Sequence, residues 1–251
     1  MGEKNRMPKP RLLVILPVYN EEAALRSVLE EWLAELRLVL HEESFVFTAW
    51  DDGSQDGSVS ILEECAARNP ELKVLRKSNS GHGQTCMMGY GMAAESDAEW
   101  ILQIDSDGQC DPRFFLKLWA LRDQADAIFG FRKIRQDGLT RNLISRILSV
   151  AVLLCTGTWV RDPNVPYRMV RTRLLKTVLP LVPGNAHLAN VFLSVLLERS
   201  AGIRWVDIAF RARSGGYSSV KGFSFVRQGI RLMGDLRSFQ NARKTATRND
   251  R

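Results

Sequence analysis

Residues 99–109 read EWILQIDSDGQ, an apolar run followed by two aspartates one residue apart, a glycine and a glutamine. The apolar run predicts a buried strand over residues 99–104. In an extended segment alternate side chains point the same way, so the oxygens of Asp105, Asp107 and Gln109 are expected to converge. Hard oxygen ligands suit Mg²⁺ or Mn²⁺, which keep positions open for substrate phosphates. The stretch therefore predicts a divalent-metal site where a strand ends.

Other interpretations of these acids remain open. Asp111 before Pro112 is typical of an acid that caps a helix, and a polar loop with capping acids is the simplest alternative for the whole stretch. An EF-hand loop beginning at Asp105 is excluded, because Cys110 and Leu116 occupy its glycine and glutamate positions. A haloacid-dehalogenase-type phosphatase also carries DxDG after an apolar strand, but there the motif follows the first strand, whereas here it follows the fourth.

Strands and helices alternate along the first half of the chain. Apolar runs predict strands at residues 12–16, 44–50, 72–77, 99–104 and 126–131, and helical spacing predicts helices at residues 21–40, 56–69, 84–96 and 112–124. This alternation indicates an α/β fold with a mostly parallel central sheet flanked by helices. In such sheets ligands bind at the carboxyl ends of strands. Polar clusters follow three of those ends, with the sequences PVYNEE at 17–22, DDGSQDG at 51–57 and DSDGQ at 105–109.

The pattern changes after residue 131. A long apolar helix is predicted over residues 141–157, followed by the short segment VPYRMVR at 165–171, a helix over 187–200 and a strand over 203–210. Residues 214–220, SGGYSSV, have no periodic apolar positions and are predicted to form a mobile lid loop that becomes ordered when ligand binds. A basic amphipathic helix at 223–239 precedes a polar tail.

Composition limits the class of protein. The 251 residues are 45% hydrophobic and 25% charged, which is typical of a folded globular protein. The net charge of +7 comes from the C-terminal end, since residues 211–251 contain ten Lys or Arg and two Asp or Glu. No known nucleic-acid-binding motif accompanies this basic end, and aromatic residues are not interleaved with it as stacking platforms. The four cysteines form no CxxC pair, which favours reduced thiols in a cytosolic protein.

Two segments bear on membrane contact. Residues 143–160 are apolar apart from Arg146 and a few small or hydroxyl side chains, and a core helix, an interfacial helix and a spanning helix remain open for them. Arg146 argues against a span. The helix at 223–239 is expected to face an anionic membrane surface, although an apolar stripe of this kind also packs on protein cores. Its apolar side comprises Phe223, Val226, Ile230 and Met233, and its arginines are Arg227, Arg231 and Arg237.

Several motifs together point to a family. LPVYNEE, WDDGSQDGS, SGHGQT with GYGMA, IDSDGQCDP and FGFR occur in the order and at the spacing of family 2 glycosyltransferases with the GT-A fold, which they resemble. Three later segments are similar to the dolichyl- and polyprenyl-phosphate sugar synthases, such as the dolichol-phosphate mannose synthases; they are RNLISR at 141–146, VRDPNVPYRMVR at 160–171 and FRARSGGYSS at 210–219. The resemblance implies a domain at 11–220, with a nucleotide-binding half at 11–131, an acceptor half with the lid loop at 132–220, and a basic C-terminal segment at 221–251.

The resemblance also implies roles for individual residues. Asp105, Asp107 and Gln109 are expected to bind Mg²⁺ or Mn²⁺, and Asp107 and Arg132 to act in catalysis. The residues expected to bind the nucleotide sugar are Pro17, Tyr19, Glu21, Trp50, Asp51, Asp52, Asp105, Ser106, Asp107, Arg132 and Arg213. The residues expected to bind the acceptor are Arg141, Ser145, Arg146 and Ser218. Asp51 and Asp52 also fit ordinary loop caps, and Arg132 a solvated arginine.

The resemblance implies an inverting transfer of a sugar from a nucleotide-diphosphate donor to a polyprenyl phosphate, by an enzyme that is cytoplasmic and peripheral to a membrane. The segment VPYR at 165–168 stands where the family often shows GxFR, and Ser219 stands where it often has lysine, so the sugar and nucleotide remain open. A family 2 enzyme acting on a glycan or other hydroxyl acceptor is the alternative. A nucleic-acid-binding protein or a phosphatase fits the sequence less well, and the oligomeric state is not predicted.

Overall fold

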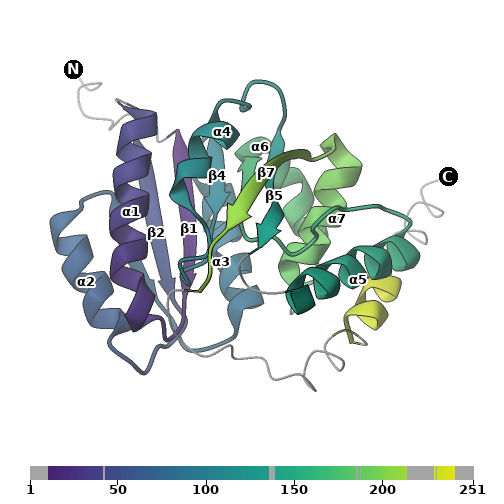
Figure 1. Ribbon diagram of the computed structural model, residues 1–251, viewed down its shortest axis with the longest axis horizontal. Coiled ribbons are helices and arrows are strands. Elements are labelled where there is room, and N and C mark those ends of the chain that lie inside the picture. Colours follow the sequence, from purple (N-terminus) through teal and green to yellow (C-terminus); the bar gives the residue numbers. More distant parts are fainter. Residues whose placement is uncertain are drawn as a thin grey trace.

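A seven-stranded sheet forms the centre of the protein (Figure 1). This computed structural model describes residues 11–41, 43–135, 139–184, 186, 188–213, 229 and 231–240, without the side chains of 134, 135 and 139–142. The strands are β1 (Leu12–Val18), β2 (Phe45–Asp51), β3 (Leu72–Arg76), β4 (Trp100–Gln103), β5 (Ala127–Arg135), β6 (Arg168–Arg171) and β7 (Arg204–Phe210). Their order across the sheet is β3-β2-β1-β4-β6-β5-β7. β6 runs antiparallel to both of its neighbours, and the other pairs are parallel.

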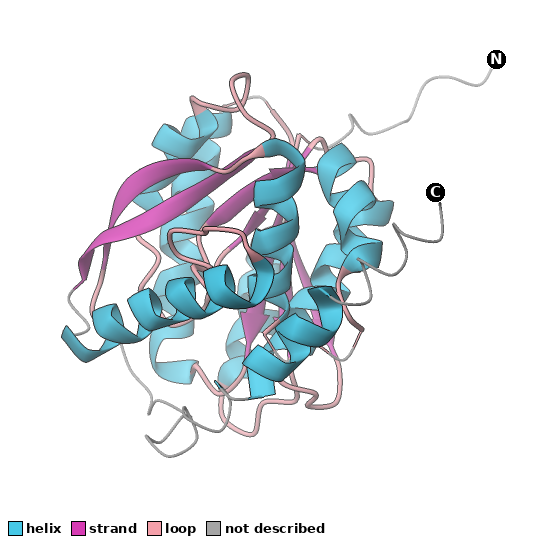
Figure 2. Cartoon of the chain, turned by 90° about the vertical axis from the view of Figure 1, so that its right-hand side faces the viewer, coloured by secondary structure: helices cyan, strands magenta, loops and turns pink. Residues whose placement is uncertain are grey.

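Helices cover both faces of this sheet (Figure 2). They are α1 (Glu22–Leu40), α2 (Ser58–Arg68), α3 (His82–Glu95), α4 (Phe115–Trp119), α5 (Leu139–Thr156), α6 (Thr172–Val178) and α7 (Ala189–Ala201), with short 3₁₀ helices η1 (Pro112–Phe114) and η2 (Leu179–Leu181). α1 packs with α2 and α4 on one face, whereas α3 packs with α6 and α7 on the other. The predicted α/β fold with a mostly parallel sheet is confirmed.

The inner strand β1 shows why the sequence folds in this way. β1 lies between two parallel strands and beneath helices, and all seven of its residues are buried, which accounts for its unbroken apolar sequence. Trp32 of α1 packs edge-on against Tyr167 and Phe115, with ring centroids 5.4 and 6.4 Å apart. On the other face Gly89 of α3 approaches so closely that a Cβ would lie 2.5 Å from Ile15. Gly89 thus lets α3 lie directly on β1, while Trp32 ties α1 to α4 and to the segment before β6.

The structure divides one predicted helix and adds another. The predicted helix at 112–124 is split into η1 and α4, and α4 ends at Trp119. Asp111 accepts a hydrogen bond from the backbone N–H of Arg113 at 3.1 Å and so caps η1, as expected for an acid before a proline. α6 was not predicted, because its seven residues are too few to show a helical period.

The described part of the C-terminal helix packs on the protein. Within residues 231–240, the side chains of Leu232, Leu236 and Phe239 are buried, and Phe239 meets Phe192 of α7 with ring centroids 5.5 Å apart. The alternative that this helix packs on the protein therefore holds for residues 231–240. Met233 is the described member of the predicted apolar side, and it is half-buried against the core. Phe223, Val226, Arg227 and Ile230, which were assigned to the same helix, lie outside the described residues.

α5 instead exposes apolar side chains. Its inner side is buried through Ser149, Val152, Cys155 and Thr156, so the expectation of a core helix holds for one side only. Its outer side exposes Leu143, Ile144, Ile147, Val150, Leu153 and Leu154, and Trp159 beyond its end is also exposed. Among the described residues, no helix combines the length and the apolar character that crossing a bilayer requires. α5 therefore has the two-sided character expected of an interfacial helix.

Candidate active site

The polar clusters that follow β1, β2 and β4 lie along one edge of the sheet, because these three strands are parallel neighbours. The register pairs Val18 of β1 with Asp51 of β2, and Ile15 of β1 with Gln103 of β4. The acids that come after each strand therefore leave the sheet in the same direction. This is the arrangement that the sequence predicts for a ligand site.

Glu21, which follows β1, is a buried carboxylate in this cluster. One of its oxygens pairs with Arg213, and the other is buried without a hydrogen-bond partner. Burial raises the pKa of Glu21 to about 7; Arg213 opposes the shift, and the negative charges of Asp107 and Asp105 add to it. Three carboxylates and one guanidinium thus lie close enough to affect one another, and together they leave an excess of negative charge.

Asp105, which follows β4, is held from two sides. The side-chain amide of Gln103 donates to its Oδ1 at 3.0 Å, and the imidazole Nε2 of His82 lies 3.7 Å from the same oxygen. Gln103 is fully buried and also accepts from Tyr90 at 3.3 Å and from Asn190 at 3.2 Å. Side chains from α3, β4 and α7 therefore set the orientation of the Asp105 carboxylate.

The loop after Asp105 is tied to the segment after β7. Asp107 accepts from the backbone N–H of Gln109 at 3.1 Å, and the Gln109 side-chain amide donates to the carbonyl of Arg211 at 3.1 Å. Arg211 in turn donates to Asp111 at 2.8 Å and to Glu31 of α1 at 2.5 Å. The Gln109 nitrogen therefore links the acidic loop to the segment that leads to Arg213. The Gln109 oxygen is the atom of this side chain that could bind a metal.

The donor set suits a divalent cation that is shared with another molecule. Among the described residues, no three His, Cys, Asp or Glu side chains gather as a metal-binding group by themselves. Asp105 and Asp107 are both partly exposed, and their charges act together on Glu21. Two carboxylates beside a buried, partly unpaired third one fit Mg²⁺ or Mn²⁺ with the remaining oxygens supplied by a ligand, such as a diphosphate. Asp105, Asp107 and the Gln109 oxygen are the residues that would hold it.

Two of the acids predicted to bind the nucleotide sugar, Asp51 and Asp52, have protein partners of their own. Asp52 is buried and accepts from the backbone N–H groups of Ser80 and Gly81 at 2.8 and 2.9 Å, and it also pairs with Lys77. These contacts hold the turn that leads into α3. Asp51 accepts from the backbone N–H of Ser54 at 3.2 Å, as a loop cap does. A role of either acid in nucleotide binding stays a prediction.

Other predicted donor-binding residues differ in their access to the surface. Tyr19 is exposed at the end of β1, beside the acids. Pro17 is buried within β1, and the buried Trp50 donates its indole N–H to Thr48 at 3.2 Å. Ser106 is buried in the acidic loop. The structure therefore presents Tyr19 but not the Trp50 indole at the sheet edge.

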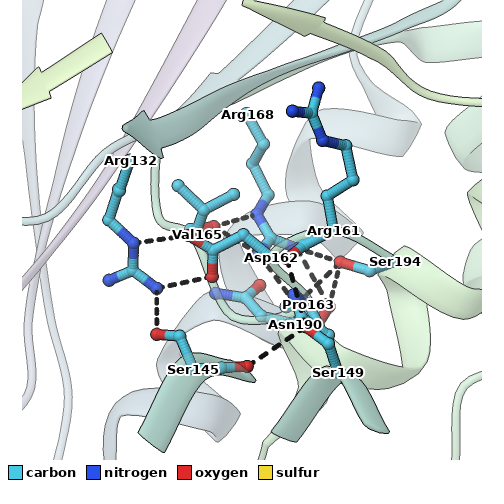
Figure 3. Close-up of polar contacts among 10 residues, drawn as sticks. All are labelled: Arg132, Ser145, Ser149, Arg161, Asp162, Pro163, Val165, Arg168, Asn190 and Ser194. Atoms are coloured by element: carbon cyan, nitrogen blue, oxygen red, sulfur yellow. Dashed lines mark hydrogen bonds and ion pairs between the residues drawn. The ribbon is translucent and has the colours of Figure 1, made fainter. Parts of the chain in front are cut away.

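A second polar group lies where β5 and α5 meet (Figure 3). Arg132 of β5 makes a two-pronged contact with Asp162, whose two oxygens accept from Nε and Nη2 at 2.6 Å each. Nη2 also donates to the Ser145 hydroxyl of α5 at 3.4 Å. The Arg132 guanidinium lies 5.2 Å from the ring centroid of Phe210 at the end of β7. Arg132 is therefore an oriented, nearly buried guanidinium and not a solvated one.

Sequence reasoning did not single out Asp162 as a site residue. Asp162 is buried in the loop before β6, and the signal that points to it is an acid flanked by an arginine and a proline ahead of a short apolar strand. Its partner Arg132 lies 30 residues away, so no local pattern connects the two. Arg168, which anchors the same loop, was noted only as part of VPYR.

Comparisons with known proteins agree with the geometry. The profile of the family described as "Glycosyl transferase family 2" matches residues 13–188 of the chain. The chain belongs to this family. A crystal structure of glucosyl-3-phosphoglycerate synthase from Mycobacterium tuberculosis in complex with uridine-diphosphate superposes with a TM-score of 0.66 at 20% identity, covering 92% of this chain and 80% of that chain. The expected GT-A fold is confirmed, and membership of this family makes the protein a glycosyltransferase enzyme.

Curated relatives come from the expected branch. The undecaprenyl-phosphate 4-deoxy-4-formamido-L-arabinose transferase of Photorhabdus laumondii subsp. laumondii is 29% identical over 233 residues, which are 90% of this chain and 66% of the relative. The transferase of the same name from Pectobacterium atrosepticum is 30% identical over 230 residues, 89% of this chain and 65% of the relative. This family 2 glycosyltransferase thus spans just under two thirds of the length of these relatives.

The predicted acceptor residues are only partly visible. Ser145 joins the Arg132 group, and Arg146 is exposed on the outer side of α5. The side chain of Arg141, as well as Ser218 and the lid loop at 214–220, lie outside the described residues. In this family 2 glycosyltransferase the structure therefore brings Glu21, Arg213 and the acidic loop together at one place, and Ser145 and Arg132 together at another.

Proposed function

We propose that this family 2 glycosyltransferase moves a sugar, with inversion, from a nucleotide-diphosphate donor to a polyprenyl phosphate at the cytoplasmic face of a membrane. The observation that carries the proposal is the two-sided character of α5. The inner side of the helix brings Ser145 to the Arg132 guanidinium, while its outer side exposes apolar residues. A polyprenyl phosphate fits both sides of the helix: its anionic head suits the Arg132 guanidinium, and its hydrocarbon tail suits the exposed apolar residues.

The donor half rests on the acids that follow β1 and β4. A Mg²⁺ or Mn²⁺ held by Asp105 and Asp107 would supply positive charge to the departing diphosphate. Mn²⁺ accompanies uridine-diphosphate in the crystal structure of the M. tuberculosis synthase, which shares the fold with a TM-score of 0.64. Gln103 and His82 orient Asp105, so one of the two carboxylates is preorganised before donor binds. Arg213 lies beside Glu21, where it also adds positive charge near the diphosphate.

The acceptor half rests on Arg132, which the resemblance assigns to the nucleotide sugar and to catalysis but whose contact with Ser145 favours the acceptor phosphate. Its planar, always charged guanidinium offers five N–H donors, a geometry suited to phosphate oxygens. Asp162 holds it in one orientation, and Ser145 supplies a hydroxyl at the same place. An acceptor phosphate is already anionic, since its second pKa is about 6, so its oxygen can attack the sugar carbon without a proton-accepting residue. The bond from that carbon to the diphosphate oxygen then breaks, and the diphosphate leaves with the electron pair.

Contact with the membrane surface follows from the same helix. The α5 sequence contains no Asp or Glu, and Arg146 is exposed among its apolar side chains. An apolar face that carries basic and no acidic residues suits an anionic leaflet. All four cysteines are free thiols, in keeping with a reducing compartment.

The test is a transfer assay with purified protein. The protein is incubated with a panel of radiolabelled nucleotide sugars and with polyprenyl phosphate in lipid vesicles, in the presence of Mg²⁺ or Mn²⁺ or of excess chelator. We expect a sugar-linked lipid from at least one donor and none in chelator. A glycan or alcohol acceptor in place of the lipid tests the alternative. Transfer to such a hydroxyl acceptor without transfer to polyprenyl phosphate would refute the proposed acceptor.

A further inference from the structure

Arg168 is a fully buried cation at the start of β6, in the middle of the sheet (Figure 3). The register places it opposite Gln103 of β4 on one side and Phe129 of β5 on the other. Its guanidinium lies 4.8 Å from the ring centroid of Phe129. Arg168 is thus level with the residue that orients Asp105, although it comes from the acceptor half of the chain.

Within the part of the chain that the structure describes, every hydrogen-bond partner of Arg168 is neutral. Nε donates to the carbonyl of Val165 at 2.9 Å, and Nη2 contacts the same carbonyl and that of Pro163. Nη1 donates to the carbonyl of Asn190 at 3.0 Å and to the hydroxyl of Ser194 at 3.3 Å. The one side chain therefore joins the loop before β6 to the first turn of α7.

A buried charge without a carboxylate partner is costly. Burial lowers the pKa of Arg168, and the negative charges of Asp105 and Asp162 are among those that oppose the shift, so the guanidinium is within electrostatic reach of both acids. A well-packed apolar side chain would avoid this cost if Arg168 served only to fill space. A guanidinium is the side chain that supplies five donors in one fixed plane, and several carbonyls here need donors at set directions.

In one direction these contacts lead to the acceptor half. Arg168 and Ser194 both bond to the carbonyl of Pro163, Ser194 at 2.8 Å. Pro163 follows Asp162, the acid that orients the Arg132 guanidinium. The position of Arg132 therefore depends on a loop whose backbone Arg168 holds.

In the other direction they lead to the donor half. The carbonyl of Asn190 accepts from Arg168, and the Asn190 side chain contacts Tyr90 at 2.9 Å and Gln103 at 3.2 Å. Gln103 donates to Asp105 at 3.0 Å. Asn190 and Tyr90, which connect Arg168 with Gln103, are both buried, so solvent does not interrupt this series of hydrogen bonds.

We propose that Arg168 is a positioning residue that sets the distance and orientation between Asp105 in the donor half and the Arg132–Asp162 pair in the acceptor half. It touches no substrate; it acts through the loop before β6 and through Asn190. The inference rests on the proposed division into a donor half and an acceptor half. Because transfer requires the acceptor oxygen to meet the sugar carbon in line, a displacement of about 1 Å between the halves is expected to lower the transfer rate about a hundredfold.

The test compares Arg168→Lys with the matched variant Arg171→Lys. Arg171 lies at the other end of β6, donates to Glu99 at 2.6 Å and to the carbonyl of Arg122 at 2.9 Å, and stacks on Trp100 at 4.4 Å. It therefore resembles Arg168 in strand, side-chain type and ring contact, but it pairs with Glu99 and Asp126 and lies away from the site. Both variants lose a guanidinium fork and keep the charge, so both are expected to lower the thermal stability.

Three quantities are measured for each variant: binding of uridine diphosphate with Mn²⁺, hydrolysis of the donor by water, and transfer to the acceptor that the panel identifies. For Arg168→Lys we expect kcat for transfer to fall about a hundredfold, with binding and hydrolysis within about threefold of wild type. Arg171→Lys is expected to leave all three within about threefold. Equal loss of transfer and hydrolysis in Arg168→Lys, or equal loss of transfer in both variants, would overturn the proposal.

Two further measurements keep the test decisive. If Arg168→Lys does not fold, Ser194→Ala removes one bond to Pro163 and is expected to lower transfer about tenfold while hydrolysis is unchanged. In an Asp162→Asn background the effect of Arg168→Lys should shrink to about threefold or less, because both act through the same loop. If Arg168→Lys lowers transfer equally in the wild-type and Asp162→Asn backgrounds, Arg168 does not act through the loop before β6. If the wild-type protein acts only on a hydroxyl acceptor, the proposed acceptor is refuted. The role of Arg168 is then tested with that hydroxyl acceptor, by comparing the ratio of transfer to hydrolysis in Arg168→Lys and in the wild type.

Discussion

The exposed side of α5 allows a quantitative prediction for membrane binding. Leu143, Ile147 and Leu154 expose 58%, 58% and 79% of their surface, which together is about two whole aliphatic side chains. Burying one such side chain contributes about 2 kcal/mol. An insertion that buries half of this area therefore contributes about 2 kcal/mol, and replacing all three residues by serine should lower the partition into vesicles about 30-fold.

The assay is flotation of the protein with vesicles that contain anionic lipid, over a range of lipid concentrations. Because the three side chains are exposed, the triple variant should retain the thermal stability of the wild type within a few degrees. Leu38→Ser is the matched control, since Leu38 on α1 is 65% exposed but lies on a different helix. This control is expected to partition as the wild type does.

Salt separates the two contributions to binding. High salt should weaken partition by screening Arg146, which contributes about 1 kcal/mol near an anionic surface, and should leave the apolar contribution in place. Unchanged partition of the triple variant, or an equal loss in Leu38→Ser, would refute the assignment of α5 as the membrane-facing helix. In that case another protein or a second copy of the chain would be the partner of this surface.

Three further predictions concern the site. Asp107→Asn should lower metal-dependent transfer about a thousandfold without changing the fold, and full activity in that variant would exclude a metal role. Because Glu21 holds a proton up to about pH 7 in the folded chain but only to about pH 4.5 when unfolded, the stability of the metal-free protein should fall as pH rises from about 4.5 to about 7 and then level off. Glu21→Gln should remove that slope in thermal melts, and a persistent slope would assign it elsewhere. Ser145→Ala should raise the acceptor KM about tenfold with kcat nearly unchanged; an unchanged KM would separate Ser145 from the acceptor.

The inner strands β1, β2 and β4 could be predicted because they are buried along almost their whole length. Unbroken apolar runs such as that of β1 arise when helices lie above and below a parallel strand. The edge strands β3 and β7, which are only partly buried, were predicted from shorter apolar runs at residues 72–77 and 203–210. β6 was less evident, because its four residues are shorter than any clear period and include two arginines.

The clustering of the acids at one edge of the sheet could also be predicted, because they are close together in sequence and each group follows a strand. The C-terminal helix was assigned to a membrane and α5 left open, since a sequence pattern cannot show which apolar stripe the rest of the chain covers. Phe239 packs against Phe192, whereas Leu154 stays exposed among the described residues. The partner of an amphipathic helix is a property of the tertiary structure.

The direction of β6 explains why Asp162 escaped prediction. A parallel strand delivers to the site the residues that follow it, as β4 delivers Asp105. An antiparallel strand delivers the residues that precede it, so the loop before Arg168 brings Asp162 to the same edge of the sheet. Asp162, which orients Arg132, thus comes from a segment that ends at the start of a strand, and a search for polar residues after strands passes over it. One reversed strand is sufficient to bring a second set of side chains to this edge of the sheet, as the proposed reaction between two bound substrates requires.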